Sequence, residues 1–99
     1  NRTPAAGLVE ILTTHRTLAR FGRLPQVVIA ALSGDAMGGG CEVALACDLR
    51  IMAEGDFRIG LPEISAGIPP GAGGSVRLAR TVGPSRAAAL MLQARVLDP

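Results

Sequence analysis

Three consecutive glycines constrain this chain more than any other feature. Gly38, Gly39 and Gly40 stand between a short β-branched run, residues 27–32, and an apolar stretch of helical character. Each glycine in the opening turn of a helix costs up to about 1 kcal/mol relative to alanine, so something must require them there. The pattern predicts a strand buried on both faces, a turn, and a helix over 38–47 whose start comes close to another backbone or to a ligand.

Helical and strand-like segments alternate along the rest of the chain, which is typical of an α/β protein. With 99 residues, the chain can form one domain or less. Its spacing of apolar residues, glycines and prolines predicts helices over 4–22, 75–82 and 84–94, strands over 48–53 and 57–60, and a loop over 64–74.

The first predicted helix carries an apolar stripe that we expect to face the core. His15 lies in this stripe and is expected to be a satisfied core or boundary histidine rather than a catalytic base. Local spacing places no serine–histidine–acid relay around it. The stripe also contains Leu8, Ile11, Leu12, Leu18 and Ala19.

The composition excludes several classes of partner. The net charge is +2, and the two aromatic residues, Phe21 and Phe57, offer little to stack on bases, so we expect no nucleic-acid partner. The longest apolar run, residues 27–32, is too short to span a bilayer, so we expect no membrane partner. One histidine and no CxxC pair exclude the usual zinc spacings.

The cysteines and the N-terminus bear on the compartment. Cys41 and Cys47 are six residues apart, which places them on different faces of one helix, so no disulfide is expected between them. Free thiols fit a reducing compartment, and we expect a cytoplasmic protein. The chain starts at Asn1 without methionine or a basic-then-apolar leader, so we expect a fragment with no secretory signal.

Two glutamates are the candidates for acid–base chemistry. Glu42 lies in the first turns of the glycine-led helix among apolar neighbours, and we expect its carboxyl group to be poorly solvated. Glu63 follows 21 residues later, after Pro62 at a predicted strand exit. Two such groups at one pocket can exchange protons with a substrate and a water, and one should then carry a proton at rest. Taken singly, each glutamate also fits an ordinary structural role.

The remaining polar and glycine-rich positions have structural explanations. Asp35 is expected to cap the glycine-led helix, and Asp48 to fix a turn or strand start. Residues 71–75 resemble a phosphate cradle, but the absence of lysine excludes a P-loop, so we expect a turn that begins a helix. For the triple glycine, tight helix–strand packing competes with an oxyanion-binding N–H, best offered by Gly39. A dinucleotide site fits the glycines less well than either, because G-x-G-x-x-G does not match and no acidic residue stands about 20 residues on in the ribose position.

Four segments together carry a family resemblance. Residues 26–34, 38–48, 59–63 and 70–78 closely resemble, in this order, the enoyl-CoA hydratase/isomerase (crotonase) superfamily. The resemblance implies the crotonase fold, a spiral of ββα units, usually assembled as trimers or pairs of trimers. Residues 1–99 would form its central part, without the N-terminal strands and the C-terminal helical segment.

The resemblance also implies a chemistry. It implies a lyase of fatty acid metabolism that adds water across the 2,3-double bond of an acyl-CoA thioester, with coenzyme A as part of the substrate and no further cofactor or metal. Gly39 matches the second donor of the family's oxyanion hole, whose first donor belongs to an upstream segment. Glu42 and Glu63 match the two catalytic glutamates: we expect Glu42 to hold and activate the water and Glu63 to exchange the C2 proton. Further substrate contacts are expected at Gly38, Leu61, Pro62 and Gly71.

Alternatives and departures from the family pattern remain. An enoyl-CoA isomerase, another crotonase-fold enzyme on acyl-CoA, or a non-catalytic acyl-CoA-binding fragment would carry much the same sequence. Pro69 stands where the family more often has an aliphatic residue, which could reshape the acyl pocket. The turn over 54–58 looks one residue longer than in the usual hydratase, which could shift Glu63 relative to Glu42.

Overall fold

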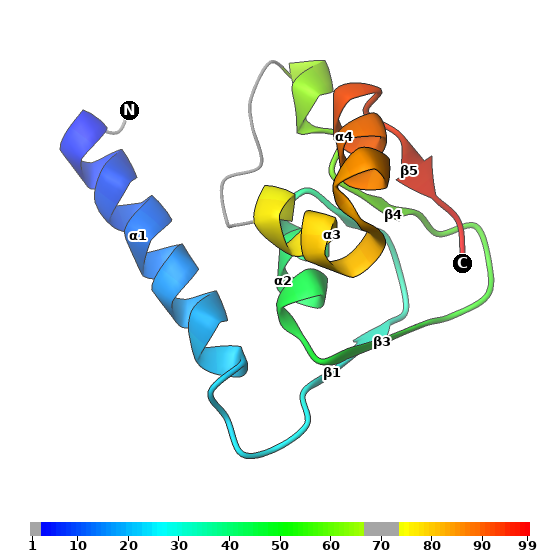
Figure 1. Cartoon of the computed structure of the whole chain (residues 1–99), viewed down its shortest axis with the longest axis horizontal. Coiled ribbons are helices and arrows are strands. Elements are labelled where there is room, and N and C mark those ends of the chain that lie inside the picture. The colour runs from blue at the N-terminus through cyan, green and yellow to red at the C-terminus, as the bar shows by residue number, and fades with distance from the viewer. Residues whose placement is uncertain (1–2, 67–73) are drawn as a thin grey trace.

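The computed structural model of the chain describes residues 3–66 and 74–99. Helices and strands alternate along it as an α/β arrangement (Figure 1). The elements are α1 Pro4–Phe21, β1 Ile29–Leu32, β2 Ala36–Met37, α2 Gly39–Ala46, β3 Leu49–Met52, β4 Ile59–Gly60, the short 3-10 helix η1 Glu63–Ala66, α3 Gly74–Val82, α4 Pro84–Leu92 and β5 Val96–Leu97.

Two small sheets flank helix α2. Strands β1 and β3 run parallel, with Ile29 opposite Leu49, and α2 forms the connection between them. Strand β2 pairs in parallel with β4, which in turn pairs antiparallel with β5. Strand β2 is followed by α2, and its parallel neighbour β4 is followed by η1. The starts of these two helices therefore lie at the same end of the second sheet.

The core lies where α2, α3 and α4 meet. Cys41 of α2, Leu61 after β4, Leu78 of α3 and Ala87 of α4 form one buried cluster. Helix α1 stands apart from this core in Figure 1. The core therefore supports α2, which carries Glu42, and the end of β4, which leads to Glu63 at the start of η1.

Local sequence explains several element boundaries. The Thr3 hydroxyl accepts a hydrogen bond from Ala6 N at 3.1 Å, and Pro4 occupies the first position of α1. Pro84 likewise occupies the first position of α4. The expected role of Asp48 is confirmed, because its Oδ2 accepts a hydrogen bond from Val28 N at 2.8 Å and ties β1 to the start of β3.

The expected cap by Asp35 is wrong. Helix α2 has Gly38 at its N-cap and no side-chain cap. The carboxylate of Asp35 instead accepts a hydrogen bond from Arg58 N at 2.9 Å, 23 residues further along the chain. The strand β2, which the sequence pattern did not predict, separates Asp35 from α2 and aims it at β4.

Other expectations need smaller corrections. Part of the loop expected over 64–74 is the 3-10 helix η1, and residues 67–73, including Pro69 and Gly71, lie outside the described residues. Helix α4 ends at Leu92, two residues early, and Ala94 takes a positive φ of 49° that leads into the unpredicted strand β5.

The expected burial of β1 and of the α1 stripe is also wrong. Burial alternates along β1, and Ile29 is 52% exposed, because β1 pairs only with β3 among the described residues. Of the apolar residues in α1, Leu18 is the buried one, and His15 is exposed. Helix α1 leaves most of its stripe uncovered because it diverges from α2 and α3 (Figure 1).

Within the described residues, none of the helices combines the length and the hydropathy needed to cross a bilayer.

Candidate active site

The start of α2 is joined to β4 through Gly38. Its N–H donates a hydrogen bond to the Gly60 carbonyl at 3.0 Å, and its own carbonyl accepts one from Glu42 N at 3.0 Å. Gly38 has φ of 57° and ψ of −122°, a conformation that strains any residue with a side chain. Backbone geometry, rather than helix–strand packing alone, thus explains the first glycine of the triplet.

Gly39 leaves the helix start open. It is the first residue of α2, so its N–H has no acceptor within the helix, and a Cβ placed on it would meet no atom within 4 Å. An oxyanion could therefore approach this N–H, where the helix dipole favours negative charge.

Glu42 lies one turn into α2 and is buried, with 3% of its surface exposed. Its Oε2 accepts a hydrogen bond of 2.8 Å from Gly74 N, the first residue of α3. The carboxyl group is thus held between two helix starts rather than solvated on a helix face. This placement agrees with the expectation of poor solvation.

Glu63 is the first residue of η1, shortly after β4, and its side chain lies beside Gly38 at the start of α2. A Cβ on Gly38 would lie 3.8 Å from Glu63 Cδ and 3.9 Å from its Oε1. Among the described residues, none makes a hydrogen bond with this buried Oε1. Burial raises the pKa of the Glu63 carboxyl, its own backbone lowers it, and the charge of Glu42 raises it further.

The two carboxyl groups therefore differ in their surroundings. Glu42 has a backbone N–H directed at it, which stabilises a negative charge. Burial raises the pKa of Glu63, the charge of Glu42 acts on it as well, and its Oε1 has no hydrogen-bond partner within residues 3–66 and 74–99. Such a pair can hold one proton between them and present two different partners to a substrate.

The sequence model of the enoyl-CoA hydratase/isomerase family matches residues 10–99. The chain belongs to this family. Over 81 residues it is 46% identical to a short-chain-enoyl-CoA hydratase of Clostridium acetobutylicum, a match that covers 82% of this chain and 31% of that protein. Over 71 residues it is 51% identical to a crotonyl-CoA hydratase of Syntrophomonas wolfei, covering 72% of this chain and 27% of that protein.

Solved structures agree with the family assignment. An enoyl-CoA hydratase of Geobacillus kaustophilus superimposes with a TM-score of 0.96 at 44% identity, over 99% of this chain and 37% of that one. The predicted crotonase-type fold is thereby confirmed for this part of it. The chain spans about a third of the length of the enoyl-CoA hydratase/isomerase relatives that it matches.

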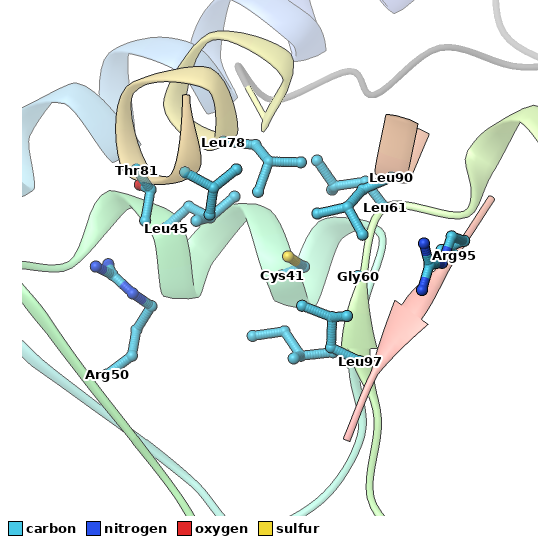
Figure 2. Close-up of a pocket in the computed structure, with 12 residues that line it drawn as sticks. Cys41, Leu45, Arg50, Gly60, Leu61, Leu78, Thr81, Leu90, Arg95 and Leu97 are labelled. Atoms are coloured by element: carbon cyan, nitrogen blue, oxygen red, sulfur yellow. The ribbon is translucent and has the colours of Figure 1, made fainter. Parts of the chain in front are cut away.

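An apolar cavity of about 150 Å³ in this family member is lined by residues of α2, α3, α4, β4 and β5. Figure 2 shows Cys41, Leu61, Leu78 and Leu90 converging on it from α2, the end of β4, α3 and α4. Burial raises the pKa of the Cys41 thiol to about 11, with the charges of Glu63 and Glu42 acting in the same direction. The thiol is therefore neutral and packs as an apolar group.

Arg50 binds the C-terminal end of α2. Arg50 Nη1 donates hydrogen bonds to the carbonyls of Ala44 at 3.1 Å and Cys47 at 3.0 Å. A cation at the C-terminus of a helix complements the dipole whose positive end is at Gly39.

Two residues predicted to contact substrate, Leu61 and Pro62, lie behind or beside the carboxyl groups. Leu61 has its side chain buried in the core, so it supports the site from behind, and Pro62 is half-buried between β4 and Glu63. Contacts of these residues with substrate stay predictions. Gly74 was not predicted as a site residue, although its glycine-rich run had the pattern of an anion cradle; the anion it meets is the carboxylate of Glu42.

Proposed function

We propose that the complete protein containing this chain is an enoyl-CoA hydratase. The observation that carries the proposal is the unequal carboxyl pair at the start of α2. Glu42 accepts a hydrogen bond from the Gly74 N–H, whereas Glu63 has a pKa raised by burial and a buried Oε1 that finds no hydrogen-bond partner in the described part of the chain. Hydration needs one group that takes a proton from water and one that supplies a proton to carbon, and unequal surroundings support this division.

The proposed reaction assigns one proton to each glutamate. Glu42 accepts a proton from a water whose oxygen forms a bond to C3 of the 2-enoyl thioester. The electron pair of the C2–C3 double bond moves toward the thioester, and negative charge develops on the carbonyl oxygen. Protonated Glu63 then delivers its proton to C2, which yields the 3-hydroxyacyl thioester with atoms and charge balanced.

Gly39 is the proposed oxyanion donor within this chain. Its N–H stands at the open, positive end of the α2 dipole, where an enolate oxygen would be stabilised. One such donor is typically worth about 3–4 kcal/mol of transition-state stabilisation. The other donor, the first of the family's oxyanion hole, is expected from a segment upstream of this chain, as the resemblance implies.

Finer parts of the proposal rest on the family alone. We propose an acyl-CoA substrate, contacted in part by Gly38, Leu61, Pro62 and Gly71, and no separate cofactor. We also propose assembly of the complete protein as trimers or pairs of trimers, and a place in cytoplasmic fatty acid metabolism. The names of the hydratases from Clostridium acetobutylicum and Syntrophomonas wolfei support the substrate class.

Substitution of Glu63 tests the proposed reaction. The complete protein should hydrate a short trans-2-enoyl-CoA, and Glu63→Gln should lower kcat by about 10²–10⁴-fold, the usual contribution of a general acid or base. Glu54→Gln, at an exposed turn position, is the matched control and should keep the parent rate.

Other outcomes would point elsewhere. A shifted double bond without 3-hydroxy product would replace hydration with isomerisation. Tight acyl-CoA binding without any product would indicate a non-catalytic binder. Full hydration by Glu63→Gln would contradict the role given to this glutamate.

A further inference from the structure

We propose that Gly74 is a positioning residue for Glu42. Its N–H fixes the carboxylate at the start of α3, and its lack of a side chain leaves the room that this carboxylate occupies. The inference rests on the proposed function, because it explains how one carboxyl group of the pair is kept in place for water activation.

The hydrogen bond supplies the first argument. Gly74 N lies 2.8 Å from Glu42 Oε2, and the two residues are 32 positions apart, so the contact joins two separate helices. Glu42 is buried, and the donor is the first of the nine residues of α3. A buried carboxylate at the start of a helix gains both a charge-assisted hydrogen bond and the favourable end of the dipole.

The space around Gly74 supplies the second, independent argument. A Cβ at this position would lie 2.7 Å from Glu42 Cγ, 2.9 Å from Oε2 and 3.1 Å from Cδ. Separations below 3.0 Å require something to shift, and the atoms that would shift belong to the carboxyl group and the methylene beside it. A side chain at position 74 would therefore displace Glu42.

Backbone conformation does not account for this glycine. The described glycines with positive φ are Gly38, Gly55 and Gly83, and Gly74 is not among them. Position 74 can thus accept an alanine as far as φ is concerned, and contact with Glu42 is the reason that it holds a glycine. Gly7, in the first turn of α1, gives the contrast, because a Cβ there would meet no atom within 4 Å.

Steady-state kinetics of the complete protein test the positioning role. Gly74→Ala should lower kcat for hydration by about 10–100-fold, because displacement of a reacting group by about 1 Å costs this much. The KM for the enoyl-CoA should change by less than about threefold, because Glu42 acts on the water in the chemical step. Gly7→Ala, the matched control in a helix first turn, should leave both constants unchanged.

A thermal unfolding cycle tests the contact without relying on activity. Gly74→Ala should lower the unfolding midpoint in the parent. The same change in a Glu42→Ala background should lower it little, because the Glu42 side-chain atoms that the new methyl group would clash with are absent there. This second background keeps the test decisive even where Gly74→Ala alone is too unstable to assay.

The outcomes separate this inference from the proposed function. Equal loss of midpoint in both backgrounds, or an active parent whose kcat is unchanged by Gly74→Ala, would overturn the role of Gly74 and leave the hydratase proposal standing. A folded parent without hydration would overturn the hydratase proposal itself, and the role in water activation with it.

Discussion

At the scale of single residues, the same functional group appears in two unlike environments. Glu42 is buried against the N–H of Gly74, and Glu63 has a buried oxygen with no partner among the residues that the structure describes. Their side chains are chemically identical, so the difference comes entirely from the elements that surround them. In the proposed reaction, the fold rather than the residue type would distinguish acid from base.

Titration of Glu63 provides a direct check of this asymmetry. Burial is the larger cause of its raised pKa and the charge of Glu42 a smaller one. In the complete protein, we expect the Glu63 carboxyl carbon to titrate above the ordinary glutamate value of about 4.3. Glu42→Gln removes the neighbouring charge, so the midpoint should fall but stay above that value.

NMR of the ¹³C-labelled side chain measures this midpoint, with Glu54→Gln as the control that should leave it in place. Since the proposed hydration needs protonated Glu63, kcat/KM should fall as the pH rises through the same midpoint, because kcat/KM reports the titration of the free enzyme. A Glu63 that titrates at its ordinary value in the parent would remove the basis for its role as the acid.

At the scale of elements, α2 has a defined group at each end. Gly38 and Gly39 form its open start, and Arg50 closes its last turn through the carbonyls of Ala44 and Cys47. The helix that carries Glu42 is therefore anchored at the end distant from the site as well as at the site.

Removal of the Arg50 anchor should cost stability. Arg50→Met keeps an apolar stem but leaves two carbonyls without a charged donor, so the free energy of unfolding should fall by about 2 kcal/mol. Arg58→Met removes only a 3.5 Å ion pair with Asp56 on the exposed surface and should cost less than about 0.5 kcal/mol. Urea unfolding of the complete protein compares the two, and equal losses would refute the anchoring role.

The elements also show how far sequence reasoning reaches. The bounds of α2 and the start of α4 followed from glycine and proline at helix starts, because these are local effects. The two-residue strands β2 and β5 could not be predicted, since so short a strand exists only through its partner β4. Asp35 was assigned to a local cap for the same reason: its true partner, Arg58 N, is brought to it by that sheet.

In the candidate site, too, residues with a local sequence signal could be predicted and a residue defined by a distant contact could not. Glu42, Glu63 and Gly39 were singled out from their local sequence, and the family resemblance matched them to roles that remain predictions. Gly74 was missed because its partner lies 32 residues away and no local pattern connects the two.

At the scale of the whole molecule, much apolar surface is left uncovered. Ile29, Leu49 and Ile51 are more than half exposed on the β1–β3 pair, as is Leu8 on α1. The chain spans about a third of its relatives. Large apolar side chains exposed in such number mark places where other parts of a protein, or other subunits, pack.

The isolated 99 residues should therefore behave differently from the complete protein. We expect the isolated chain to unfold over a broad temperature range, to bind a hydrophobic dye and to show no hydration, because one oxyanion donor and much of the covering surface are supplied elsewhere. In hydrogen exchange, amides of α1 should exchange faster than those of α2. Calorimetry and exchange mass spectrometry measure both, and a sharp transition with measurable turnover would contradict this expectation.

The short ladder between β2 and β4 bears on how this protein can change in evolution. Ala36 N donates to the Arg58 carbonyl at 2.8 Å and Gly38 N to that of Gly60 at 3.0 Å, so the ladder begins at Arg58, the last residue of the turn over 54–58. A residue inserted earlier in that turn would lie outside this pairing and would leave the register that places Glu63 beside Gly38 intact. The length of this turn and the geometry of the carboxyl pair are therefore separable, and we expect an insertion there to be tolerated.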